Sequence, residues 1–231
     1  MSEVTNNEDL RGFNPIIKER IDKLRENSEF NKRVRIFLEF IQKYPNQAAE
    51  LLALRENDAH VDSLTGSLTY RGFAEHSLII IEQIKAINPE ILENTWILYG
   101  DVDGLKRTND TQKRKAGDNL LVSINDSIKE VVGGELLGRV GSDEFAILLI
   151  NIKGDSVKEV YNKIMQAVEM KRRNNVIPEW SGISFGLAKV GKNTNLKEVL
   201  YNADEAMREA KDKRINTPGE RGGHVDMVLI E

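Results

Sequence analysis

The sequence contains no cysteine, so disulfide bonds, thiolate catalysis and cysteine-ligated metals are excluded. Its three histidines, His60, His76 and His224, are scattered and show no HExxH-type ligand spacing. The longest apolar stretches run to about six residues, far fewer than the roughly 20 needed to span a bilayer. The first residues, 1–7, are polar and acidic, unlike a secretory signal. These absences predict a cytoplasmic protein with no membrane partner.

An excess of positive charge is missing as well. Lysine and arginine total 33 against 37 acidic residues, which leaves a net charge of −4. Without a basic footprint, no nucleic-acid partner is expected. A hydrophobic content of 40% and a charged content of 30% describe a globular protein with enough apolar material for a core. The 231 residues can hold one domain of ordinary size and a shorter appendage.

The pattern of apolar residues places a boundary near residue 58. After a polar start of about 12 residues, apolar side chains between Ile16 and Ile41 recur at helical spacing, and residues 48–55 follow as a third short helix. We expect residues 1–58 to form an N-terminal helical segment that serves as a stalk for dimerisation or for regulation. A solvated helical cap on the main domain is the alternative.

Residues 59–231 alternate between helical and strand-like patterns. The predicted helices are 71–88, 116–132, 155–171 and 196–213, and the predicted strands are 95–102, 135–140, 144–150, 180–190 and 224–230. Only Gly141-Ser142-Asp143 separates two of these strands, which is hairpin spacing. We therefore predict an α/β (α+β) fold in which one mixed sheet with an antiparallel hairpin is covered by helices, as in ferredoxin-like and palm folds.

Two acidic clusters adjoin the predicted buried strands. Asp101 and Asp103 follow the apolar run 96–100, and Asp143 and Glu144 precede the apolar run 145–150. Carboxylates at the ends of buried strands are typical of a divalent cation held for phosphate chemistry, because Mg²⁺ is bound by one or two carboxylates plus substrate phosphates. Carboxylates at a hairpin tip that are merely solvated are the simpler alternative.

Four motifs in register make residues 62–216 resemble a GGDEF domain, the diguanylate cyclase family. The motifs are Asp62-Ser-Leu-Thr-Gly66 with Arg71 and Phe73; Asp101-Val-Asp-Gly-Leu-Lys-Arg-Thr-Asn-Asp110 with Gly117-Asp118; Arg139-Val-Gly-Ser-Asp-Glu-Phe145; and Ala203-Asp-Glu-Ala-Met207 with Ala210-Lys211. The resemblance implies the GGDEF palm-like fold for residues 59–231. It also implies that two GTP molecules are joined into cyclic di-GMP.

The resemblance also implies roles for the acidic residues. Asp101, Asp143 and the backbone carbonyl of Val102 would bind Mg²⁺ or Mn²⁺. Asp143 and Glu144 would be the catalytic acids of the signature, and Glu144 would assist deprotonation of the attacking 3′-hydroxyl or support the metal site.

Further residues match the family's substrate-binding positions. Backbone around Gly104 and the cations Lys106 and Lys211 would contact phosphates, although solvated lysines are the default. Asn109 and Asp118 would read guanine, and Asp118 could instead cap a helix. The other implied substrate contacts are Leu105 and Leu121, which could equally be core, together with Gly141, Ser142 and Arg214.

The match departs from the family pattern in five places. Ser142 replaces the second signature glycine, so reduced activity is expected. Lys113-Arg114 replaces Gly-His, Thr69-Tyr70 replaces Asn-Arg, and Ile215 replaces a phosphate-binding arginine for which Arg214 could substitute. Val132 and Glu135 replace the RxxD pair of the inhibitory product site, so feedback through that site is not expected.

The sequence favours a GTP-specific cyclase that acts as a homodimer through its N-terminal helices, because two GTP-loaded half-sites must meet. A degenerate GGDEF module that binds GTP or a partner protein without turnover is the first alternative. A palm-type cyclase that makes another cyclic dinucleotide is the second.

Overall fold

A computed structural model describes residues 60–133, 135–192, 195–215 and 229–230. The chain divides into two units, 1–52 and 53–231, and every described residue belongs to the second. The predicted N-terminal helices, and with them the predicted dimerisation surface, therefore lie outside the described residues. Most of the predicted strand 224–230 does so as well. Among the described residues, no helix is long and apolar enough to cross a membrane.

The described elements follow the predicted order with three additions. In chain order they are β1 Leu68–Thr69, α4 Tyr70–Ile87, η2 Pro89–Asn94, β2 Trp96–Asp103, α5 Leu105–Gln112, α6 Arg114–Val132, β3 Leu136–Arg139, β4 Glu144–Leu149, α7 Gly154–Arg173, β5 Gly182–Lys189, α8 Leu196–Ile215 and β6 Leu229–Ile230. The sequence did not predict β1, η2 or α5. It also placed the start of α6 at residue 116, whereas that helix begins at Arg114.

A six-stranded mixed sheet forms the centre of the domain, in the order β1-β3-β4-β2-β5-β6. β2 pairs antiparallel with β4 on one side and with β5 on the other, and the outer pairs β1–β3 and β5–β6 are parallel. The run β2-α6-β3-β4-α7-β5 is the split βαβ arrangement of ferredoxin-like folds. The predicted fold class is confirmed.

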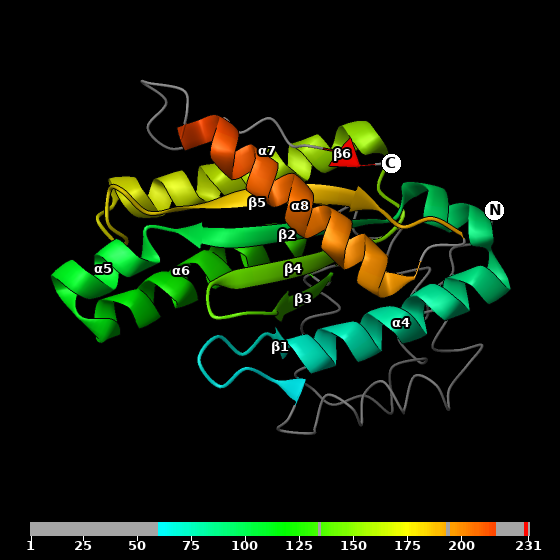
Figure 1. Ribbon diagram of the computed structural model, residues 1–231, viewed down its shortest axis with the longest axis horizontal. Helices are drawn as coiled ribbons and strands as arrows, with labels where there is room; N and C mark the ends of the chain where they lie inside the picture. Colours follow the sequence, from blue (N-terminus) through cyan, green and yellow to red (C-terminus); the bar gives the residue numbers. More distant parts are fainter. Residues whose placement is uncertain (1–59, 134, 193–194, 216–228, 231) are drawn as a thin grey trace, which may run out of the picture. The chain divides into compact units, whose positions relative to one another are not determined.

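Helices cover both faces of this sheet (Figure 1). On one face, apolar side chains of α6 and α7 pack against β2, β4 and β5 in a core that includes Ile124, Ile164 and Phe185. On the other face, α4 and α8 pack through residues such as Phe73 and Ala203. Because strand side chains alternate between faces, each residue of β2 belongs to one of these two layers.

Candidate active site

The carboxyl end of β2 brings acidic side chains to the face covered by α8. Leu98 and Val102 belong to the core beneath α6 and α7, so the alternation directs Tyr99, Asp101 and Asp103 to the opposite face. In the sheet register, Asp101 lies opposite Glu144 of β4. Like charges at directly opposed strand positions repel one another. A pairing that is unfavourable for the fold is typical of a functional site.

Helix α8 supplies a cation to this acidic cluster. The Lys211 ammonium forms an ion pair with Asp101 Oδ1 and lies 4.0 Å from Asp103 Oδ1. The other Asp103 oxygen accepts a hydrogen bond of 2.9 Å from the hydroxyl of Ser184 on β5. The helix can approach β5 this closely because Gly186 of β5 has no side chain. A Cβ atom at Gly186 would overlap the backbone of α8. The predicted phosphate cation thus contacts a predicted metal ligand.

Burial and, after it, neighbouring negative charges perturb the ionisation of the cluster. Burial, partly offset by Lys211, raises the pKa of Asp101 above its ordinary value, and Asp143 and Asp103 raise it further. Burial also raises the pKa of Glu144, followed by the charges of Asp204, Asp101 and Asp143. The site is therefore short of positive charge, the condition that a bound divalent cation corrects.

Tyr99 and Asp204 are neighbours of Glu144 that the sequence analysis did not single out. The Tyr99 hydroxyl donates a hydrogen bond to Glu144, and burial followed by the Glu144 charge raises the pKa of Tyr99. Asp204 of α8 pairs with Arg208 at 2.8 Å through one oxygen, while its other oxygen is buried without a hydrogen-bond partner. Two sequence signals could have identified these residues. The period-two pattern of β2 places Tyr99 on the same face as Asp101, and the spacing from Asp204 to Lys211 is two helical turns.

The β3–β4 hairpin positions the remaining signature residues. The N–H of Val102 donates to the Asp143 carbonyl at 2.8 Å, which fastens the hairpin turn to β2. The Ser142 hydroxyl donates to Asp143 Oδ1 at 2.6 Å. A Cβ atom at Gly141 would overlap the Glu144 carboxylate, so a side chain at this position would displace that carboxylate from where it lies.

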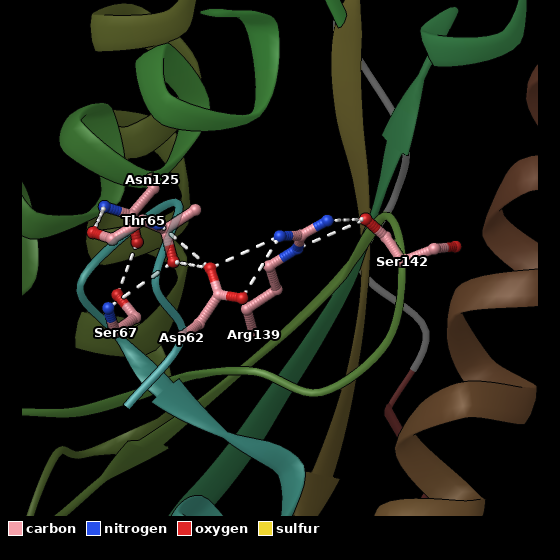
Figure 2. A network of polar contacts seen from close by, with 6 residues as sticks. All are labelled: Asp62, Thr65, Ser67, Asn125, Arg139 and Ser142. Carbon is pink, nitrogen blue, oxygen red and sulfur yellow. Dashed lines mark hydrogen bonds and ion pairs between the residues drawn. The ribbon is translucent and has the colours of Figure 1, made fainter. Parts of the chain in front are cut away.

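A polar network connects this hairpin to the segment that precedes β1 (Figure 2). Arg139 donates through Nη2 to the Ser142 carbonyl at 2.6 Å and through Nη1 to the Asp62 carboxylate at 3.2 Å. Asp62 also accepts from the backbone N–H and the hydroxyl of Thr65, at 2.9 and 2.7 Å. Asn125 of α6 donates to the Thr65 carbonyl at 3.1 Å. Burial opposes ionisation of Asp62, but the hydrogen bonds from Thr65 and then the charge and hydrogen bond of Arg139 outweigh it and lower the pKa of this carboxyl.

The predicted guanine-reading residues lie on α5 and α6. A Cβ atom at Gly117 would overlap Asn109 Oδ1 and lie 3.1 Å from Leu105 Cδ1, so these side chains cluster beside Gly117. Asp118 lies a full turn after Arg114, which makes the helix-capping role considered for it wrong. Leu121 is buried in the core.

The predicted phosphate contacts are less closely grouped. Gly104 adopts a φ of 77° at the start of α5, a conformation that glycine favours, and Lys106 beyond it is exposed. Arg214 and Ile215 lie in the last turn of α8, where the described structure does not extend to their side chains. Val132, at the position of the family's inhibitory arginine, is buried in the core, whereas Glu135 accepts from the Ile150 N–H at 3.4 Å.

The donors present fit a hard divalent cation. Within the described ranges, no three histidine, aspartate or glutamate side chains already form a metal cage. Mg²⁺ does not require such a cage, because it keeps waters and substrate phosphates beside one or two carboxylates. Asp101 and Asp143 are the two carboxylates available for such an ion, and burial together with the charges of Asp143 and Asp103 raises the pKa of Asp101 despite the contact with Lys211.

Comparison with known proteins agrees with this geometry. The family model described as diguanylate cyclase, GGDEF domain matches residues 59–217. Diguanylate cyclase DgcP of Escherichia coli is 27% identical over 80% of this chain and 56% of its own length. The probable diguanylate cyclase DgcT of E. coli is 30% identical over 70% of the chain and 35% of its own length. The chain thus spans about half or less of these relatives.

A solved structure shows the same architecture. The isolated GGDEF domain of TpbB from Pseudomonas aeruginosa matches with a TM-score of 0.61 and 25% identity, over 74% of this chain and 95% of that one. The family match covers well over half of the sequence. The chain therefore belongs to the GGDEF-domain family.

Proposed function

We propose that this protein is a diguanylate cyclase that condenses two GTP molecules into cyclic di-GMP and two pyrophosphates. The observation that carries the proposal is the pairing of Asp101 with Glu144 across β2 and β4, with Asp143 beside them and Lys211 above. Because the repulsion between these carboxylates destabilises the fold, we expect the carboxylates to serve the reaction. Diguanylate cyclase relatives support cyclic di-GMP synthesis as the general chemistry of the family.

The reaction forms one phosphodiester bond for each GTP that reacts. The 3′-hydroxyl oxygen of one GTP attacks the α-phosphorus of the other, the bond to the pyrophosphate oxygen breaks, and the hydroxyl proton leaves. Glu144 would accept that proton, because a carboxylate with a raised pKa is a stronger base than an ordinary one. The Tyr99 hydroxyl would hold the Glu144 carboxylate in place through its hydrogen bond.

Asp101, Asp143 and the Val102 carbonyl would hold Mg²⁺ or Mn²⁺. Such an ion supplies charge neutralisation for the phosphates and stabilises the leaving group. Lys211 would then exchange its contact with Asp101 for one with the β- or γ-phosphate. Lys106, Arg214 and the Gly104 backbone would complete phosphate binding.

Base selection would rest on Asn109 and Asp118. A carboxylate accepts from guanine N1–H and the exocyclic amine, and an amide pairs with the remaining edge, whereas adenine lacks these donors. Leu105 would form an apolar wall beside the base, and Leu121 would support that wall from the core. Gly141 and Ser142 would line the nucleotide where the hairpin turns.

Each half-site holds one GTP, so synthesis requires two chains to meet. Homodimerisation through residues 1–58 would supply this encounter, and GTP would be the shared partner of both half-sites. Because the RxxD pair is replaced by Val132 and Glu135, the product would not inhibit through that site.

A GTP-binding module without turnover is the second candidate. Its specific support is that Ser142 donates a hydrogen bond to Asp143 and thereby occupies one oxygen of a predicted metal ligand. The replacements at Lys113-Arg114 and Ile215 point the same way.

Incubation of the full chain with GTP and Mg²⁺, or with Mn²⁺ in parallel, separates the two candidates. We expect cyclic di-GMP and pyrophosphate by chromatography from the wild type and none from Asp143→Ala. GTP binding without product at high protein concentration would refute the cyclase and establish the binding module. Formation of a different cyclic dinucleotide from mixed nucleotides would refute the assigned base specificity.

A further inference from the structure

Trp180 lies outside every motif of the family resemblance, yet it packs against the start of α5. Its indole Nε1–H donates to Thr108 Oγ1 at 3.2 Å, and the guanidinium carbon of Arg107 lies 4.2 Å from the ring centroid. A Cβ atom at Gly104 would lie only 2.9 Å from both Trp180 Cδ1 and the Trp180 carbonyl oxygen. One side chain from the segment before β5 therefore contacts three residues around the Gly104 turn.

The helix that Trp180 contacts has little intrinsic stability. α5 spans only Leu105–Gln112, has no side-chain cap at its start, and buries Thr108 alone. Isolated helices shorter than about 12 residues are marginal in water, so α5 depends on tertiary contacts. Thr108 closes the first turn, since its N–H and its hydroxyl both donate to the Gly104 carbonyl at 2.9 Å. Trp180 binds that same hydroxyl oxygen and covers the turn.

We propose that Trp180 is a positioning residue for nucleotide binding. By fixing Thr108 and the Gly104 turn, it holds α5 so that the Gly104 backbone, Lys106 and Asn109 face one bound GTP. The inference rests on the substrate assignment made above. Trp180 acts through α5, and the cost of removing it is looser nucleotide binding.

The chain offers a matched control in Trp96, at the opposite end of β2. Its Nε1–H donates to the Ile152 carbonyl at 2.8 Å, and Lys189 Nζ lies 5.6 Å from its ring centroid. Both indoles thus combine one hydrogen bond with one cation–π contact. Substitution of either ring lowers stability, but only Trp180 adjoins α5.

The test measures binding of 3′-deoxy-GTP with Mg²⁺ to the full chain by calorimetry. This analogue lacks the attacking hydroxyl, so binding is separated from turnover. We expect Trp180→Ala to raise the Kd about tenfold, and Trp180→Phe, which keeps the ring over Arg107, to raise it about threefold. Trp96→Phe should leave the Kd within twofold while lowering the thermal midpoint. Thr108→Val should weaken binding as Trp180→Phe does.

An unchanged Kd in a folded Trp180→Ala variant would overturn the proposal. A rise in Kd for Trp96→Phe equal to that for Trp180→Phe would overturn it as well. If Trp180→Ala does not fold, the comparison of Trp180→Phe and Thr108→Val with Trp96→Phe decides. A wild type that does not bind 3′-deoxy-GTP would overturn both this inference and the substrate assignment. Binding by the wild type without cyclic di-GMP from GTP would refute only the cyclase.

Discussion

Replacement of Lys113 by glycine should stabilise the domain. Lys113 is both the C-cap of α5 and the N-cap of α6, with a φ of 71° and a ψ of 165°. Its N–H donates to the Asn109 carbonyl and its carbonyl accepts from the Ala116 N–H, both at 3.0 Å, so the conformation is fixed from both sides. Backbone in this region is essentially restricted to glycine. The family resemblance places glycine at this position.

The magnitude is a difference of two opposing effects. A residue with a side chain in this conformation costs of order 1–3 kcal/mol. Glycine loses more backbone freedom on folding, which costs roughly 0.5–1 kcal/mol. We therefore expect Lys113→Gly to raise the free energy of unfolding by about 1 kcal/mol, which for a chain of this size raises the thermal midpoint by about 2–4 °C.

Urea denaturation of three variants tests the reasoning. Lys113→Ala removes the same charge but retains a Cβ atom, so its stability should stay within about 0.5 kcal/mol of wild type. Lys163→Gly makes the same substitution on the exposed side of α7 and should destabilise by about 1 kcal/mol. A Lys113→Gly variant no more stable than Lys113→Ala would refute the argument that the backbone at Lys113 is strained.

Three further substitutions probe the acidic site. Ser142→Gly frees the Asp143 carboxylate and restores the signature glycine, so initial rates of cyclic di-GMP synthesis should rise severalfold; an unchanged rate would contradict the inhibitory role of that hydroxyl. Lys211→Met removes the ammonium group that pairs with Asp101, so calorimetry should show tighter binding of Mn²⁺ alone and at least tenfold weaker binding of GTP. If the affinities for Mn²⁺ and GTP change in the same direction, Lys211 does not exchange Asp101 for a phosphate. Burial, followed by nearby carboxylates, raises the pKa of Glu144 above 4.5, so the folded state holds this proton more tightly than the unfolded chain. The stability that this group contributes is therefore lost as pH rises from 4.5 through the folded pKa. Glu144→Gln should raise the thermal midpoint at pH 7 and leave it unchanged below pH 4. The same variant should make no cyclic di-GMP.

The long elements of the fold were predictable because their apolar periodicity is strong. α6 repeats Leu120, Ile124 and Ile128 on one side, and β4 is a continuous apolar run after its first residue, Glu144. α5 could not be found in this way, since seven of its eight residues are polar or charged and its stability comes from contacts such as that of Trp180, 72 positions away. β1 has two residues, too few for any periodicity.

The site was partly predictable for a similar reason. Motif order identified Asp101, Asp143 and Glu144. The register of β2 with β4 places Asp101 opposite Glu144, whereas Asp143 lies in the hairpin turn that the Val102 N–H holds against β2. The pairing of Lys211 with Asp101 joins residues 110 positions apart and depends on how closely α8 approaches β5 at Gly186. The start of α6 was misplaced because Lys113 adopts a positive φ, which residues other than glycine seldom do.

The central place of β2 divides the site into two parts with different resistance to local opening. Every residue from Trp96 to Asp101 is paired with both β4 and β5, so freeing the Asp101 backbone disrupts two ladders and both core layers. Amide exchange there should occur only through global unfolding. α5, which has eight residues and buries Thr108 alone, can open in smaller, cheaper fluctuations. A regulator that binds this protein can therefore weaken or strengthen the contacts of α5 with the nucleotide base while the Asp101 end of the site stays folded.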